Sequence, residues 1–131
     1  MINWNNLDTL ASFKELKDTK AVDLVSAMSG ESGADRVKSF NIPMAEGLNY
    51  NYAAKQVDSD VLDKLVKLAD EAQLADKFAA LYNGEVVNTG EKRLVLHHMT
   101  RGQLGEAVEA DGVDKRTFYK TQQERIAEFA N

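Results

Sequence analysis

The chain has 131 residues, a formal net charge of -5 and 44% hydrophobic residues, which is enough apolar content for one small domain with a modest core. It contains no cysteine, which excludes disulfide bonds, thiolate zinc sites and a cysteine nucleophile. The acidic balance argues against nucleic acid as a partner, and no apolar run approaches the roughly 20 residues that span a bilayer. The start of the chain lacks the features of a signal peptide. We therefore expect a single cytoplasmic domain over residues 1–131.

Helices are expected to dominate the first part of the chain. The apolar spacing from Trp4 to Ala11 predicts a first helix that begins near residue 3 or 5 and runs to about Lys17. A short second helix is predicted over residues 23–28, followed by a loop over residues 31–33 and one helical turn through Val37. Residues 40–52 break the helical pattern, since they hold the only proline and an alternating strand-like run. They predict a small β-hairpin that turns near residues 45–47.

The clearest helix follows Asp58, which is expected to cap it, and carries a broad apolar stripe between Val61 and Ala72. A further helix is predicted over residues 74–82, ended by Asn83-Gly84. Residues 102–112 predict an irregular connection with a short strand at 107–108. The last expected helix, residues 113–130, has a thin apolar face, which favours docking onto something outside the chain or, alternatively, a fraying terminus.

The most informative segment is residues 84–101, which read G-E-V-V-N-T-G-E-K-R-L-V-L-H-H-M-T-R. We expect a turn through Asn88, Thr89 and Gly90 that leads into a helix, with Glu91 in its first turn. Arg93, His97 and Arg101 recur every four residues, so on a helix they would share one cationic face. Such a face is able to bind a phosphate or carboxylate, but it is more often simply solvated.

This segment resembles a motif of the phosphoglucose isomerase family (glucose-6-phosphate isomerases), G-E-K-I-N-x-T-E-x-R-A-V-L-H-x-A-L-R. The matching residues are Gly84, Glu85, Asn88, Glu91, Arg93, Val95, Leu96, His97 and Arg101. Residues 36–40 resemble the family's R-F-x-x-F motif, although Val37 replaces an aromatic residue. Tyr52 stands at the tyrosine of L-x-D-Y-S-K-N, whose following residues do not match at 53–55. Residues 111–112 and 122–131 resemble the approach to the family's first sugar-isomerase domain.

The resemblance implies a mainly α segment with a small β-hairpin, the N-terminal part of a family whose full chain is α/β with two sugar-isomerase (SIS) domains. The family interconverts an aldose and a ketose phosphate through an enediol intermediate, using residues downstream of such a segment. Asn131 would lie where the first of these domains is expected to start. The resemblance therefore implies no catalytic residue in this chain, no cofactor, and no isomerase activity of the chain alone. Its implied partners are the remainder of the isomerase chain, a homodimer partner and a sugar phosphate.

By the same resemblance, Arg93 is the residue expected near the substrate, with Glu91, His97 and Arg101 in support. The alternative for Arg93 is a structural ion pair with Glu91 or with a carboxylate downstream. The alternative function for the whole chain is a freestanding helical protein-interaction module. A dissected enzyme segment should expose apolar surface and aggregate, whereas a freestanding module should be monodisperse.

Other candidate sites are weaker. His97-His98 lacks the spacing of a zinc site, so no metal is expected, and His98 is predicted to lie at the edge of the core. Tyr50 and Tyr52 are predicted to be packing residues. Asp58 and Asp60 are expected at a helix N-terminus, and Asp70 and Glu71 are expected on a solvated surface. Residues 102–105 are too short for a phosphate-binding loop and lack its lysine.

Overall fold

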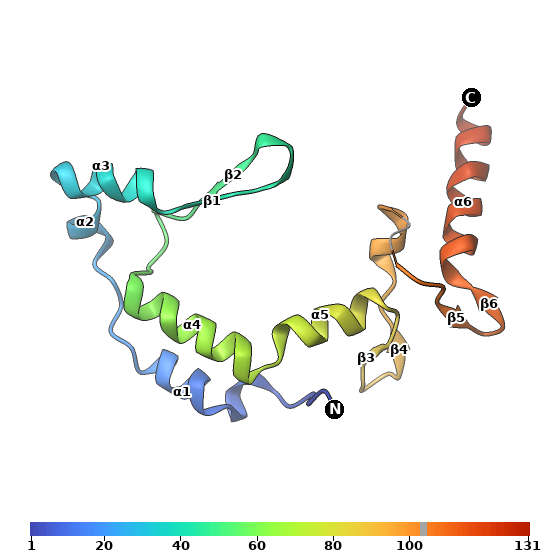
Figure 1. Ribbon diagram of the computed structural model, residues 1–131, viewed down its shortest axis with the longest axis horizontal. Coiled ribbons are helices and arrows are strands. Elements are labelled where there is room, and N and C mark those ends of the chain that lie inside the picture. The colour runs from blue at the N-terminus through green and yellow to red at the C-terminus, as the bar shows by residue number, and fades with distance from the viewer. Residues whose placement is uncertain (103–104) are drawn as a thin grey trace. The chain divides into compact units, whose positions relative to one another are not determined.

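The computed structural model describes residues 1–102 and 105–131 (Figure 1). Its described elements are mainly α-helices, as the sequence predicted, with three short antiparallel strand pairs where the sequence predicted one hairpin. The chain divides into two compact units, one formed by residues 6–72 and the other by residues 1–5 together with residues 73–131. The assignment of residues 1–131 to one domain stays a prediction. No helix in the described part of the chain is both long and apolar enough to cross a membrane.

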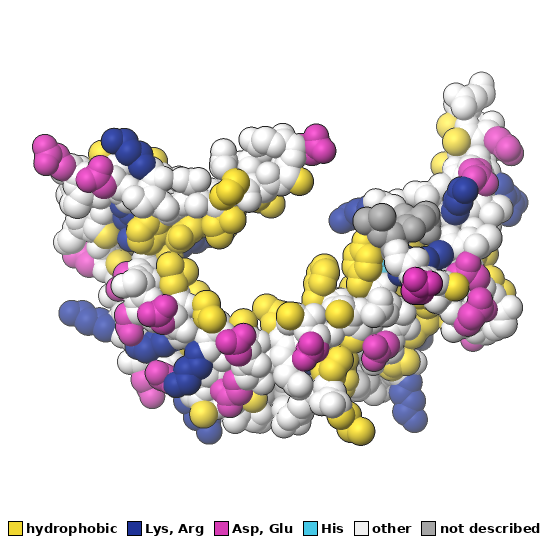
Figure 2. Space-filling view, viewed as in Figure 1, with side chains coloured by type: hydrophobic (Ala, Val, Ile, Leu, Met, Phe, Trp, Pro, Cys, Tyr) yellow, Lys and Arg dark blue, Asp and Glu magenta, His cyan; other side chains and the backbone are white. Residues whose placement is uncertain are grey.

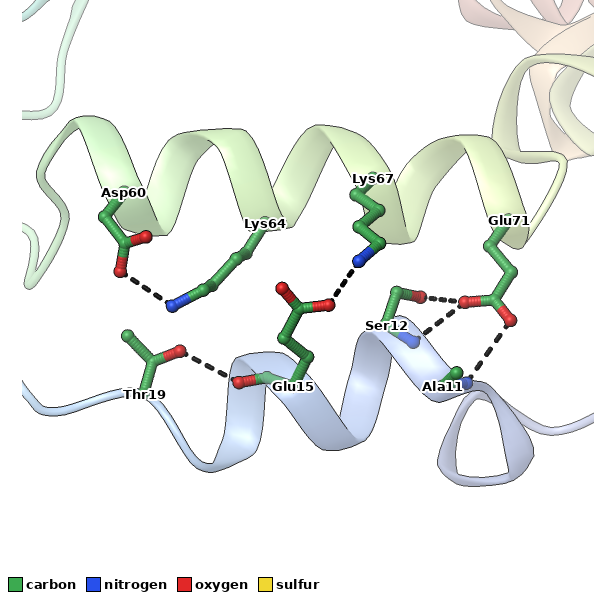
Figure 3. A network of polar contacts seen from close by, with 8 residues as sticks. All are labelled: Ala11, Ser12, Glu15, Thr19, Asp60, Lys64, Lys67 and Glu71. Carbon is green, nitrogen blue, oxygen red and sulfur yellow. Dashed lines mark hydrogen bonds and ion pairs between the residues drawn. The ribbon is translucent and has the colours of Figure 1, made fainter.

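In the 6–72 unit, helix α1 (Ala11–Lys17) packs against helix α4 (Ser59–Glu71). Polar groups hold the two helices together along their length (Figure 3). The Glu71 carboxylate accepts hydrogen bonds from the backbone N–H of Ala11 at 3.2 Å and of Ser12 at 2.8 Å, and from the buried Ser12 hydroxyl. One turn further along, Lys67 pairs with Glu15. Since Glu71 bonds the first N–H groups of α1, it acts as a cap supplied by another helix.

The remaining elements of this unit are α2 (Leu24–Ala27), α3 (Gly30–Ser39) and a hairpin of β1 (Asn41–Pro43) and β2 (Asn49–Asn51). The hairpin turns through the 3₁₀ helix η2 (Ala45–Gly47), and its register pairs Ile42 with Tyr50. The predicted hairpin and its turn are confirmed. Asp58 caps α4 by accepting a bond from the Val61 N–H at 2.9 Å, as predicted.

Two expectations for this unit were wrong. The first helix is broken, because Leu10 is extended (φ -80°, ψ 144°) between the 3₁₀ helix η1 (Leu7–Thr9) and α1. The loop expected at residues 31–33 is the first turn of α3, which starts after Ser29 and has Gly30 at φ 61°. Glu71 is exposed, as expected, and it also caps α1. This contact joins residues far apart in sequence, which helical periodicity does not reveal.

In the other unit, helix α5 (Leu74–Tyr82) leads to β3 (Val86–Asn88), β4 (Arg93–Leu94) and the 3₁₀ helix η3 (His97–Thr100). A second hairpin of β5 (Glu109–Ala110) and β6 (Val113–Asp114) then leads to α6 (Lys115–Ala130). The buried core consists of Leu96, Met99 and Val108, with Leu94 and Tyr119 packed against it. Side chains from β4, η3, residue 108 and α6 thus share one small core.

The end of the chain differs from the prediction in its details. The short strand lies at Glu109–Ala110 rather than at residues 107–108, and the helix expected from Val113 begins at Lys115. Asp114 starts the helix there, because its carboxylate accepts bonds from the N–H groups of Arg116 and Thr117. The Thr117 hydroxyl and these backbone bonds lower the pKa of Asp114. The apolar face of α6 is thin, as predicted: Ile126 and Phe129 are 66% and 94% exposed.

Candidate functional site

The 84–101 segment begins at the end of α5, where the chain stops as the sequence predicted. The N–H of Glu85 bonds the carbonyl of Ala80 at 2.9 Å, and the N–H of Gly84 bonds that of Leu81 at 3.1 Å. These two bonds form a Schellman motif, which requires a left-handed residue at its turn. Gly84 supplies it at φ 74°, and a Cβ there would lie 2.3 Å from a methyl group of Val108. Gly84 is therefore required both by the helix end and by close packing.

The segment then forms a β-hairpin, so the helix predicted from Glu91 onward was wrong. Strands β3 and β4 pair Val86 with Leu94 and Asn88 with Arg93, with a register irregularity between Val86 and Asn88. The expected capping chemistry is present, since the Asn88 side-chain oxygen accepts the N–H of Glu91 at 3.1 Å. It closes a turn instead of a helix, because Lys92 is left-handed at φ 54° and reverses the chain.

Arg93 lies on this hairpin with its side chain in solvent. Its Nη1 atom is 3.8 Å from Oε2 of Glu91, and the two side chains are 76% and 64% exposed. An exposed ion pair of this kind contributes at most about 1 kcal/mol to folding. The pairing with Glu91 that the sequence offered as an alternative is thus present, and it is weak enough to leave the guanidinium available to another anion.

The structure does not bring Arg93, His97 and Arg101 together on a helical face. Arg93 is in β4, whereas His97 begins η3 and Arg101 follows its end. His97 and Arg101 are both exposed. The four-residue spacing was read with a helical period, but the strand and the 3₁₀ turn do not follow that period. The continuous cationic stripe expected from the sequence was therefore wrong.

His98 lies at the edge of the core, as predicted. Its ring stacks on Tyr82 with the centroids 4.6 Å apart, and its Nε2 lies 3.1 Å from the Tyr82 carbonyl oxygen. The Arg116 Nη2 also donates to that carbonyl, at 2.9 Å, and Arg116 Nε donates to the carbonyl of Glu106. Arg116 is only 6% exposed, and its Nη1 has no hydrogen-bond partner among the described residues. The burial of Arg116 was not predicted, since a charged residue in a weakly amphipathic helix gives no sign of burial in the sequence.

A second cluster joins the two upstream segments that resemble family motifs. Arg36 Nε donates to the carbonyl of Ala53 at 2.8 Å, and its Nη2 donates to those of Lys55 and Val57 at 3.0 and 2.7 Å. Its guanidinium lies 4.1 Å from the centre of the Phe40 ring, which in turn is 5.1 Å from the Tyr52 ring. The region that follows Tyr52 is therefore held through its backbone, and the contacts with Arg36 need no particular side chain at residues 53–55.

The described residues contain no group of three or more histidine and acidic side chains placed to hold a metal ion. Part of the loop that we considered for phosphate, residues 102–105, lies outside the described residues, since 103 and 104 are not among them. Arg93 is exposed and only weakly paired, so it is accessible to an anion, although the hairpin alone makes no enclosed binding site.

Comparison with known proteins identifies the class to which this chain belongs. The family model described as phosphoglucose isomerase matches residues 51–131. The glucose-6-phosphate isomerase of Treponema denticola is 40% identical over 134 residues, which cover 98% of this chain and 26% of the relative. That of Borrelia garinii subsp. bavariensis is 39% identical over 99% of this chain and 24% of the relative.

The chain belongs to the phosphoglucose isomerase family. It spans about a quarter of the length of these two curated relatives. A more distant relative, the glucose-6-phosphate isomerase of Shewanella woodyi, is 38% identical over 77% of this chain.

Proposed function

We propose that this chain is the N-terminal portion of an isomerase that interconverts glucose 6-phosphate and fructose 6-phosphate in the cytoplasm. The observation that carries the proposal is the family match over residues 51–131, together with the names of relatives aligned along nearly the whole chain. Because the relatives are about four times longer, the catalytic groups belong to the remainder of the enzyme, for which we propose sugar-isomerase domains. The chain alone is then inactive.

The role that we propose for the chain within the enzyme is structural, with one contribution to the substrate site. The hairpin of β3 and β4 presents Arg93 to solvent on a short, turn-anchored support. In the assembled homodimeric enzyme, its guanidinium would lie close to the sugar phosphate. There it would stabilise negative charge on the substrate or on the enediol oxygen, as a fixed cation does in a water-poor site. Glu91 would orient Arg93, and His97 and Arg101 would support the surrounding surface.

The test is a full-length chimera, in which this chain replaces the aligned segment of the Treponema denticola isomerase. We expect the chimera to convert fructose 6-phosphate to glucose 6-phosphate, and the 131-residue chain to show no conversion. A folded but inactive chimera, or robust turnover by the chain alone, would contradict the proposed function.

The role of Arg93 is tested in the same chimera by Arg93→Ala. We expect a loss of about a hundredfold in kcat/KM, the usual effect of removing a donor that stabilises developing charge. Lys38→Ala is the matched control, since Lys38 is 78% exposed and makes a similar weak pair with Asp35 at 3.9 Å. Equal activity of the two variants would show that Arg93 does not act at the substrate site. It would not contradict the proposal that the chain is part of the enzyme.

A further inference from the structure

One face of the β1–β2 hairpin is apolar, and its side chains are about half exposed. Because side chains alternate along a strand, Ile42 and Met44 of one arm share a face with Leu48 and Tyr50 of the other. These four side chains are 52%, 57%, 65% and 48% exposed, respectively. The opposite face carries asparagines at positions 41, 49 and 51 together with the proline. A two-stranded ribbon is at best marginally stable alone, so this pattern indicates a ribbon that is covered on its apolar side.

The apolar face continues into a groove floored by the start of α4. A cavity of about 230 Å³ is lined by Ile42, Tyr50, Tyr52, Lys55, Val57, Leu62 and Leu65. Figure 2 shows hydrophobic side chains gathered between the hairpin and the first turns of α4. Tyr50 and Tyr52 stack with their ring centres 6.2 Å apart, which gives the wall of the groove a fixed aromatic surface. Lys55 is the one charged lining residue, and it forms no ion pair with any described residue.

The exposed surface of the chain as a whole is larger than expected for compact bodies of its mass. The chain exposes 9968 Å². Two separate compact bodies of half its mass each would together expose about 8,300 Å². The excess exceeds the roughly 800 Å² that each partner contributes to a specific interface. The relatives show where a cover could come from, since about three quarters of their length lies outside the aligned segment.

Building on the proposed function, we propose that this groove, which we name the hairpin groove, binds an apolar segment of the remaining isomerase chain. The segment presents aliphatic or aromatic side chains to the Ile42–Tyr50 face and places a carboxylate or carbonyl oxygen against Lys55. The hairpin therefore acts as the attachment point of the 6–72 unit to the catalytic part of the enzyme.

The test uses the absence of cysteine from this chain, which allows single cysteines to be labelled. Ile42→Cys places a thiol on the apolar face, and Asn49→Cys places one on the opposite face of the same ribbon. Maleimide labelling is followed by peptide mass spectrometry in the 131-residue chain and in the full-length chimera. In the chimera, we expect Ile42→Cys to react about tenfold or more slowly than in the isolated chain, while Asn49→Cys changes less than about twofold. Leu48→Cys repeats the measurement on the apolar face if Ile42→Cys disturbs folding.

Unchanged labelling of both apolar-face cysteines in the chimera would overturn the proposal. So would protection in the isolated chain that grows with its concentration, because a second copy would then be the occupant. Isomerase activity of the chimera is measured on the same samples. An active chimera with an unprotected hairpin refutes the docking site alone, whereas a protected hairpin in an inactive chimera refutes the proposed function alone.

Discussion

Arg36 should be a main stabilising residue of the 6–72 unit, because it ties α3 to the backbone of residues 53–57. Hydrogen bonds from a charged donor contribute about 1.5–3 kcal/mol each. Two of the three bonds, to Ala53 and Val57, are partly buried, whereas the bond to Lys55 is exposed. Stacking on Phe40 adds about 0.5–1 kcal/mol. Allowing for partial solvation, Arg36→Met should lower the free energy of unfolding of this unit by about 3 kcal/mol.

Amide hydrogen exchange of peptides covering residues 40–57 measures this loss directly. A loss of about 3 kcal/mol corresponds to exchange about a hundredfold faster. Lys38→Met on the same helix is the control, since Lys38 is 78% exposed. Arg36→Lys should recover little of the loss, because an ammonium group cannot make the same forked set of bonds. If Arg36→Met exchanges no faster than Lys38→Met, the backbone contacts of Arg36 do not stabilise the unit and the reasoning is refuted.

Two further predictions concern the turn after α5 and the contact between α1 and α4. Gly84→Ala should lower the free energy of unfolding by about 1–2 kcal/mol because of its left-handed backbone, and by about 1–3 kcal/mol more because the new methyl group collides with Val108. Gly112→Ala, at φ 71° in open space, should lower it only by the first amount. Thermal melting followed by the fluorescence of the single tryptophan compares the two variants, and equal losses of stability would contradict the collision. The Ser12 hydroxyl and the Ser12 N–H lower the pKa of Glu71 below its ordinary 4.5, so the contribution of this contact should be complete above that value and lost as the pH falls through the lowered pKa. Ser12→Ala should therefore weaken protection of α1 amides at pH 7 and make little difference at strongly acid pH, and a difference that persists in acid would argue against the charged form of Glu71.

Local patterns predicted the elements whose causes are local. The apolar stripe and the Asp58 cap located α4, the Asn83-Gly84 pair located the end of α5, and proline with strand-like alternation located the β1–β2 hairpin. Each of these depends on residues a few positions apart, so the sequence contains the whole signal. Contacts that join distant residues, such as Glu71 with Ser12 or Arg36 with Val57, were missed because no local sequence pattern signals them.

The error at residues 91–101 has a different origin. The spacing of Arg93, His97 and Arg101 fits a helix, but a helix also needs right-handed backbone at every position. Lys92 adopts a left-handed conformation to close the hairpin, and Val86 pairs with Leu94 across it. A non-glycine residue with positive φ is uncommon and carries little sequence signal. In the hairpin, Leu94 packs against the core and Leu96 is part of it, contacts that the local spacing of charges does not reveal.

The family-like segment accordingly separates into residues that build the hairpin and residues that the hairpin displays. Gly84 fits the helix end and the approach of Val108, Asn88 closes the turn, and Leu96 fills the core. These matches to the family motif have a sufficient structural cause and say nothing about a substrate. Arg93 has only a weak, exposed pair with Glu91, so folding gives little reason for an arginine there. Under the proposed role near the substrate, Arg93→Ala should reduce catalysis in the chimera while leaving its melting temperature nearly unchanged.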